Sequence, residues 1–123
     1  MAVQQFKLKK RDTRPVLEVA LKDPDGSAHD LSGADSVTLH IRLDDGTTIS
    51  RAMDIDADPT TGIVTYTWQA TDWTNDPGLY PGTHRMEYEV LGPSDARLTF
   101  PNGEDGSDPE YDELIITPDI GQA

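Results

Sequence analysis

Apolar and polar side chains alternate along most of this chain with a period of two. In one segment, Val37, Leu39 and Ile41 are separated by polar residues. Alternation over five to eight residues is typical of a β-strand with one face on a core and the other in water. The alternating segments are residues 16–22, 36–43, 49–55, 64–69, 86–90 and 111–117, with a short run at 97–100. The pattern predicts an all-β protein.

Turn-forming residues separate these segments at regular intervals. Residues 23–26 read Asp-Pro-Asp-Gly and residues 44–46 read Asp-Asp-Gly, both favourable for tight turns. Similar turn residues occupy 58–62, 75–78 and 91–95. Seven to eight short antiparallel strands spaced in this way predict a β-sandwich. Residues 69–73 are the one stretch expected to form a helical turn.

The whole chain, residues 1–123, is expected to be one domain, since 123 residues fit a single core. Within it, residues 101–110 are acidic and rich in glycine and proline, and we expect an exposed loop there. With no cysteine, the chain has no disulfides or thiol chemistry. No apolar run is long enough for a membrane span, and the first residues lack the features of a secretory signal.

Charge is strongly one-sided. Residues 1–22 hold six bases and two acids, a net of +4, and residues 23–123 hold four bases and 21 acids, a net of −17, which together give −13. A body this acidic repels phosphate backbones, so nucleic acid is not an expected partner. The basic stretch that includes Lys9, Lys10 and Arg11 is a candidate partner contact. In a repeating assembly it could meet the acidic surface of the next subunit; the simpler alternative is the solvated face of a first strand.

Residues that could carry chemistry are few. The three histidines, His29, His40 and His84, lack metal-ligand spacing. No catalytic or cofactor-binding motif appears, so the chain is not expected to be an enzyme or to bind a cofactor.

A weak calcium candidate is formed by Asp54, Asp56 and Asp58, whose spacing resembles the start of a calcium-binding loop. Pro59 and Thr65 stand where such a loop needs glycine and glutamate. The acidic loop is an equally weak cation candidate, and its residues Glu104 and Asp105 are also candidates for contact with a neighbouring protein.

The two tryptophans are expected to differ in role. Trp68 shares parity with Val64 and Tyr66, which places it in the core. Trp73 lies near a predicted loop, so it is the tryptophan expected to be exposed and a candidate partner contact.

Several segments, in order, resemble the immunoglobulin-like domain of phage baseplate upper proteins and related tail and tail-fibre proteins. The resemblance covers residues 6–117. Its pieces are residues 6–15 (FKLKKRDTRP), 21–26 (LKDPDG), 30–34 (DLSGA), 58–68, 81–83 with 87–90, and 100–102 (FPN). The chain departs from that family at His84, where an aromatic residue is common, and at 103–110, where an acidic segment intervenes.

The resemblance implies an immunoglobulin-like β-sandwich and a non-enzymatic structural role in a tailed bacteriophage or prophage particle. The expected partners are other phage structural proteins in a symmetric assembly, and the expected location is the virion, after synthesis in the bacterial cytoplasm. One alternative is a capsid decoration or head-fibre protein. Another, of a different class, is a carbohydrate-binding module for the host surface that uses Trp73 and Tyr80.

Overall fold

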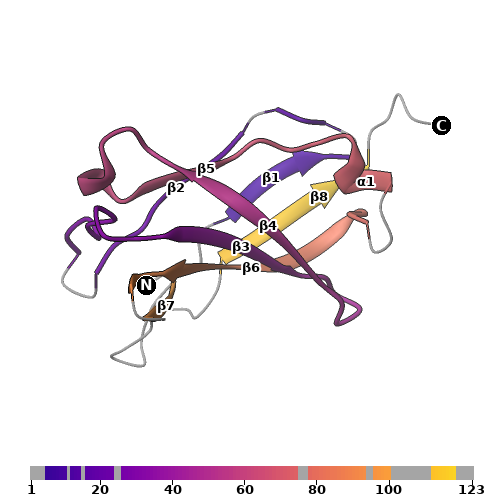
Figure 1. Cartoon of the computed structure of the whole chain (residues 1–123). Coiled ribbons are helices and arrows are strands. Elements are labelled where there is room, and N and C mark those ends of the chain that lie inside the picture. Colours follow the sequence, from indigo (N-terminus) through magenta and orange to yellow (C-terminus); the bar gives the residue numbers. More distant parts are fainter. Residues whose placement is uncertain are drawn as a thin grey trace.

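The computed structural model describes residues 5–10, 12–14, 16–23, 26–74, 78–93, 96–100 and 112–118, which form a sandwich of two β layers (Figure 1). The chain is all-β apart from one short turn of α-helix and one of 3-10 helix. The elements are β1 (Gln5–Lys9), β2 (Leu17–Ala20), β3 (Ser36–Arg42), β4 (Thr48–Ile55), η1 (Pro59–Thr61), β5 (Ile63–Tyr66), α1 (Thr71–Thr74), β6 (Gly82–Leu91), β7 (Arg97–Phe100) and β8 (Asp112–Thr117).

The larger layer has the strand order β1-β8-β6-β3-β4, and β7 pairs with the second half of β6. The smaller layer contains β2, β5 and the end of β4. Strand β4 joins the two layers, because its first part pairs with β3 and its last residues, Asp54 and Ile55, pair with β5. Figure 1 shows β4 running diagonally from β5 to β3.

One strand pair departs from the predicted antiparallel arrangement. Strand β1 lies parallel to β8, with Gln5 opposite Glu113 and Lys9 opposite Thr117. A hairpin forces its two strands to be antiparallel, but β1 and β8 come from opposite ends of the chain and share no turn. The local turn chemistry therefore could not predict their relative direction.

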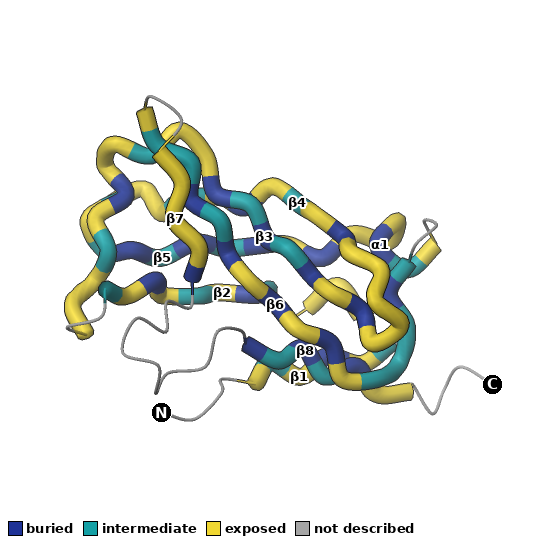
Figure 2. Tube along the Cα trace, turned by 90° about the horizontal axis from the view of Figure 1, so that it is seen from below, coloured by how far each residue is buried: buried dark blue, intermediate teal, exposed yellow. Residues whose placement is uncertain are grey.

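The predicted alternation fills the space between the layers. Buried positions alternate with exposed ones along β3 and β6, as Figure 2 shows. Trp68 is 1% exposed, as its parity predicted. The centre of its ring lies 5.2 Å from that of Tyr66, with the two rings edge to face, and 5.9 Å from that of Phe6. Phe100 is likewise buried at the end of β7.

No helix in the described ranges is long and apolar enough to cross a membrane.

The turn at Gly62 holds the smaller layer to the segment that follows β2. The Gly62 carbonyl accepts a hydrogen bond from the N–H of Leu21 at 2.8 Å, and Gly62 has a φ of +70°. A Cβ atom there would lie 2.6 Å from the Leu21 carbonyl oxygen and 2.9 Å from that of His29. Both neighbours are backbone atoms, so they cannot rotate away.

We therefore expect Gly62→Ala to lower the free energy of unfolding by at least about 2 kcal/mol, since left-handed strain of about 1–2 kcal/mol adds to the clash. Gly46 has a φ of +93° with open space around it, so Gly46→Ala should lower the free energy of unfolding only by the cost of left-handed strain. Gly33, with open space and no positive φ, is the control. Urea unfolding measures all three, and equal losses for Gly62→Ala and Gly46→Ala would contradict the proposed clash.

Candidate functional site

The weak calcium candidate has a structural role. Asp58 caps η1, because its Oδ1 accepts hydrogen bonds from the Thr60 amide at 3.1 Å and the Thr60 hydroxyl at 2.6 Å. Asp56 in turn accepts the Asp58 amide at 3.1 Å. Within the described ranges, no three histidine or acidic side chains come together as a metal site. Asp56 and Asp58 thus build a turn, and Asp54 precedes it as an exposed residue of β4.

His84 lies inside the sandwich, on the inward face of β6. It is fully buried and shares parity with Met86 and Tyr88. Its Nε2–H donates to the Tyr80 carbonyl at 2.8 Å, and its Nδ1 accepts the Asp44 amide at 3.2 Å. These partners require a neutral ring, because one nitrogen must donate and the other accept. The ring links the β3–β4 turn to the segment before β6.

Trp73 is not the exposed aromatic that its place near a loop predicted. The residue is half-buried and packs against the core, with its indole nitrogen covered. Tyr80 is also half-buried, and its hydroxyl donates to Asp44, which raises the pKa of Tyr80 to about 12. A short helix turned back onto the core, rather than an open loop, explains the covering of Trp73.

A buried carboxylate fixes this helix to the sheets. Asp72 is 2% exposed and accepts three hydrogen bonds: from Arg51 Nε at 2.8 Å, from the Tyr66 hydroxyl at 2.7 Å and from the Gln69 amide at 2.8 Å. Burial of Tyr66 and the hydrogen bond from its hydroxyl to Asp72 raise the pKa of Tyr66. The cluster joins α1, β4 and β5, so it is part of the framework.

A polar row crosses four strands on the outer face of the larger layer. His40 Nε2–H donates to Glu89 at 2.9 Å, and Glu89 accepts a second bond from Arg97 Nε at 2.8 Å. On its other side, His40 Nδ1 lies 2.8 Å from the Ser50 hydroxyl. Cross-strand register creates the row, since His40 lies opposite Ser50 on β4 and diagonally from Glu89, which is two residues along β6 from the residue opposite His40.

Serine, histidine and a carboxylate in this order resemble a nucleophilic triad. Such a triad also needs an oxyanion hole and a cleft that holds the substrate. The row lies on an open sheet face, and neither hollow described below is lined by Ser50 or His40. The geometry of the row therefore fits a set of cross-strand hydrogen bonds that hold the strands together better than it fits a catalytic site.

Two of the surface hollows are lined by described residues. A groove of about 410 Å³ beside β7 is lined by His29, Asp30, Pro93 and Leu98 among others. Leu98, 38% exposed, is the large hydrophobic side chain that the described part of the chain leaves in solvent. A smaller hollow of about 90 Å³ lies between β1 and β2. His29 is held at the groove by Asp23 at 2.8 Å and by contact with Phe100.

The predicted basic contact lies on an edge strand. Lys9 is exposed on β1, which is the first strand in the order of the larger layer and pairs on one side with β8. Lys10 is half-buried just beyond it. Arg11, Glu104 and Asp105 lie outside the described residues.

The outer face of the larger layer gathers bases that are far apart in the sequence. Strand parity and register place Lys7 and Lys9 on this face together with three arginines that sequence reasoning did not connect with them. Those arginines are Arg42, Arg85 and Arg97. Their positions in the alternation were visible in the sequence, but which strands lie side by side was not.

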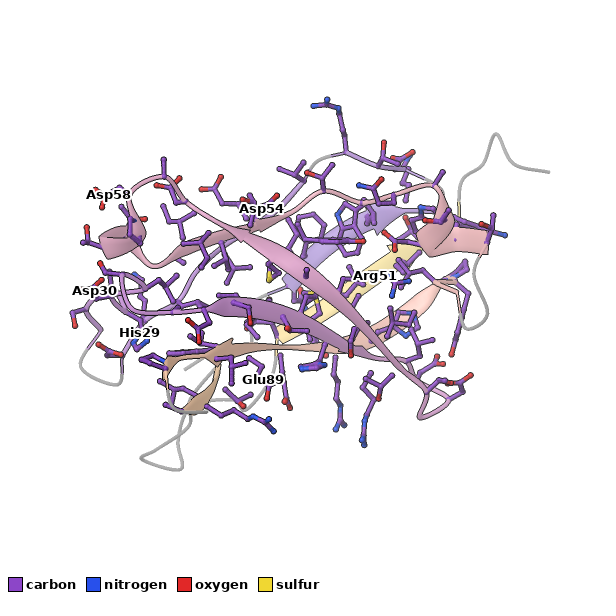
Figure 3. All side chains as sticks on the ribbon, in the orientation of Figure 1. His29, Asp30, Arg51, Asp54, Asp58 and Glu89 are labelled. Atoms are coloured by element: carbon purple, nitrogen blue, oxygen red, sulfur yellow. The ribbon has the colours of Figure 1, made fainter. Side chains whose placement is uncertain are left out.

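The opposite outer face, on the smaller layer, is acidic. Glu18 and Asp54 flank Thr65 in one row across β2, β5 and β4. Asp56 and Asp58 continue from the end of β4. Figure 3 shows Asp54 and Asp58 on one side of the sandwich and Glu89 on the other. The two faces of the molecule therefore differ in charge.

Comparison with protein-family models finds no match to this chain, and comparison with curated proteins finds none either.

Removing the buried carboxylate should be costly, because Arg51, Tyr66 and the Gln69 amide lose their acceptor together. We expect Asp72→Ala to lower the free energy of unfolding by about 3 kcal/mol. Asp54→Ala, at an exposed carboxylate, is the control and should change it by less than about 0.5 kcal/mol. Urea unfolding measures both, and a loss below 1 kcal/mol for Asp72→Ala would show that the cluster contributes little.

Stability should also depend on the protonation of Glu89. The hydrogen bond from His40, with the nearby charge of Arg97, lowers the pKa of Glu89. A carboxylate whose pKa is lower in the folded than in the unfolded state adds stability above its unfolded pKa, and loses that contribution as the pH falls through the folded value.

We therefore expect wild type to be more stable than Glu89→Gln near pH 6, with the difference shrinking as the pH falls below about 4.3, the value for an unfolded glutamate. Urea unfolding of both proteins across this range provides the measurement. A difference that stays constant with pH would mean that the charge of Glu89 makes no contribution.

Proposed function

We propose that this chain is a non-enzymatic structural component of a tailed bacteriophage or prophage particle, where an immunoglobulin-like sandwich makes assembly contacts with other structural proteins. The ordered resemblance to phage baseplate, tail and tail-fibre domains suggests the context. The observation that carries the proposal is the exposed edge strand β1, with Lys7 and Lys9 directed outward on a rigid two-layer sandwich.

Among the described strands β1 pairs on one side only, and this edge with its outward lysines fits two roles. Lysine at a strand edge opposes uncontrolled pairing with other chains. The same positive side chains can select an acidic partner surface by charge complementarity. A subunit of an ordered assembly needs both properties, since it must meet one partner and reject the rest.

A capsid decoration or head-fibre protein remains the alternative within the same class, because it requires the same stable sandwich. The carbohydrate-binding module has less support. Sugar-binding aromatics must present an open ring face, whereas Trp73 packs on the core and Tyr80 is tied to Asp44.

The context is tested by the position of the coding sequence and by the composition of particles. We expect neighbouring genes for portal, tail-tube or tape-measure proteins, and a fixed number of copies of this chain in each purified particle. Mass spectrometry of particles made with and without the gene provides the measurement. Intact, infectious particles that never contain the chain would reject the proposal, and retention on heads rather than tails would select the alternative.

The basic stretch provides a variant for the same assembly. Changing Lys9, Lys10 and Arg11 together to serine should weaken binding of the purified chain to particles that lack it, most clearly at low salt, where charge contacts are least screened. Arg14→Ser/Lys22→Ser is the control, because it removes bases outside that stretch. Equal binding by the triple variant and wild type would exclude the stretch from the contact.

A further inference from the structure

The two outer faces of the sandwich carry opposite charge, although the chain as a whole is strongly acidic. The outer face of the larger layer holds five bases, Lys7, Lys9, Arg42, Arg85 and Arg97, and three acids, Glu87, Glu89 and Glu113. Its formal charge is +2. The rest of the sequence keeps five bases and 20 acids, a net of −15, and the two parts sum to −13.

Two of these bases lie directly opposite each other. The register of β3 and β6 pairs Arg42 with Arg85. Opposed like charges on neighbouring strands destabilise a sheet. Arg42 is exposed and forms no ion pair with the residues that the structure describes. Arg85 also lies opposite Glu113 on β8, so Arg42 is the base of this pair that a facing acidic surface would neutralise.

The outer face of the smaller layer is such a surface. Glu18 and Asp54 lie in one cross-strand row, and Asp56 and Asp58 adjoin it. This face lies on the far side of the sandwich from the basic one, as the labelled Asp54, Asp58 and Glu89 show in Figure 3. One molecule therefore presents complementary faces in opposite directions.

We propose that the basic outer face of the larger layer docks on the acidic outer face of the smaller layer of a second copy of this chain. The two surfaces in this contact are different, so each copy keeps one of them free and the contact can repeat. The inference rests on the proposed structural function and names the surfaces that a repeating assembly would use. At an ionic strength of 0.15 M the Debye length is about 8 Å, so the facing pairs still attract while repulsion between more distant acids is largely screened.

Charge reversal of each face tests the contact. The basic-face variant is Lys7→Glu/Arg42→Glu, and the acidic-face variant is Glu18→Lys/Asp54→Lys; all four positions are exposed. We expect wild type to self-associate at 0.15 M salt and to dissociate towards 1 M. Either variant alone should raise the dissociation constant for self-association at least about tenfold. Sedimentation velocity over a range of protein concentrations gives the constants.

Mixing the two variants is the decisive experiment. The reversed larger-layer face of one is acidic and the reversed smaller-layer face of the other is basic, so the mixture should regain association that neither shows alone. The control, Arg14→Glu, reverses an exposed base that lies before β2, outside the strands of both faces. It should associate like wild type. Circular dichroism and urea unfolding establish that every variant is folded.

The inference is overturned if wild type remains monomeric at every salt and protein concentration, if the basic-face variant associates as well as wild type, or if the mixture shows no recovery. Binding of wild type to a polyanion such as heparin without self-association would also overturn it, in favour of a different anionic partner. None of these results removes the proposed function, because a chain that is monomeric alone but present in purified particles still has a structural role.

Discussion

The burial of every second side chain fixes where the charges of this protein can lie. In a strand, successive side chains point to opposite faces, so each inward-facing residue places its two neighbours outward. Val37, Leu39 and Ile41 are almost fully buried, and they hold His40 and Arg42 on the outer face. A slip of one residue would bury an arginine and expose the core, which makes the register strongly specified. The charge pattern of each face is therefore a consequence of core packing.

Among the described residues, the polar or charged residues classed as buried are His84, Asp72 and Asp112, and they are tolerated because their partners are built in. His84 has an acceptor and a donor for its two nitrogens, and Asp72 has three donors. Tyr88 donates to the buried Asp112 at 3.0 Å, and burial together with this carboxylate raises the pKa of Tyr88. Buried polar groups satisfied in this way restrict the chain to one arrangement, since each needs partners from separate elements. These three clusters connect turns and termini to the sheets where apolar packing alone would leave them loosely held.

Most of the fold could be predicted from the sequence, because alternation and turn residues are local signals. The short strand at 97–100 and the core position of Trp68 both follow from them. The parallel pairing of β1 with β8 could not be predicted, since it joins the two ends of the chain without a turn. The burial of His84 follows from its parity with Met86, but its bond to the Asp44 amide could not be predicted, because Asp44 lies 40 residues away. Trp73 was misplaced because the helical turn that returns it to the core depends on Asp72 and its partner Arg51, 21 residues away.

Contacts between residues far apart in the sequence also limit what the sequence predicts about function. Net charge is a property of composition, and from it the chain appeared uniformly acidic beyond its first residues. A partner at contact distance is attracted or repelled mainly by charges within about 8 Å at physiological ionic strength, so it meets one face at a time. Which charges share a face depends on register between distant strands: Arg42 and Arg85 are 43 residues apart and directly opposed. Three of the four bases of residues 23–123 join the lysines of β1 on one side, while Glu18 and Asp54 gather on the other. The molecule therefore has one basic and one acidic outer face, an asymmetry of charge that its composition does not reveal.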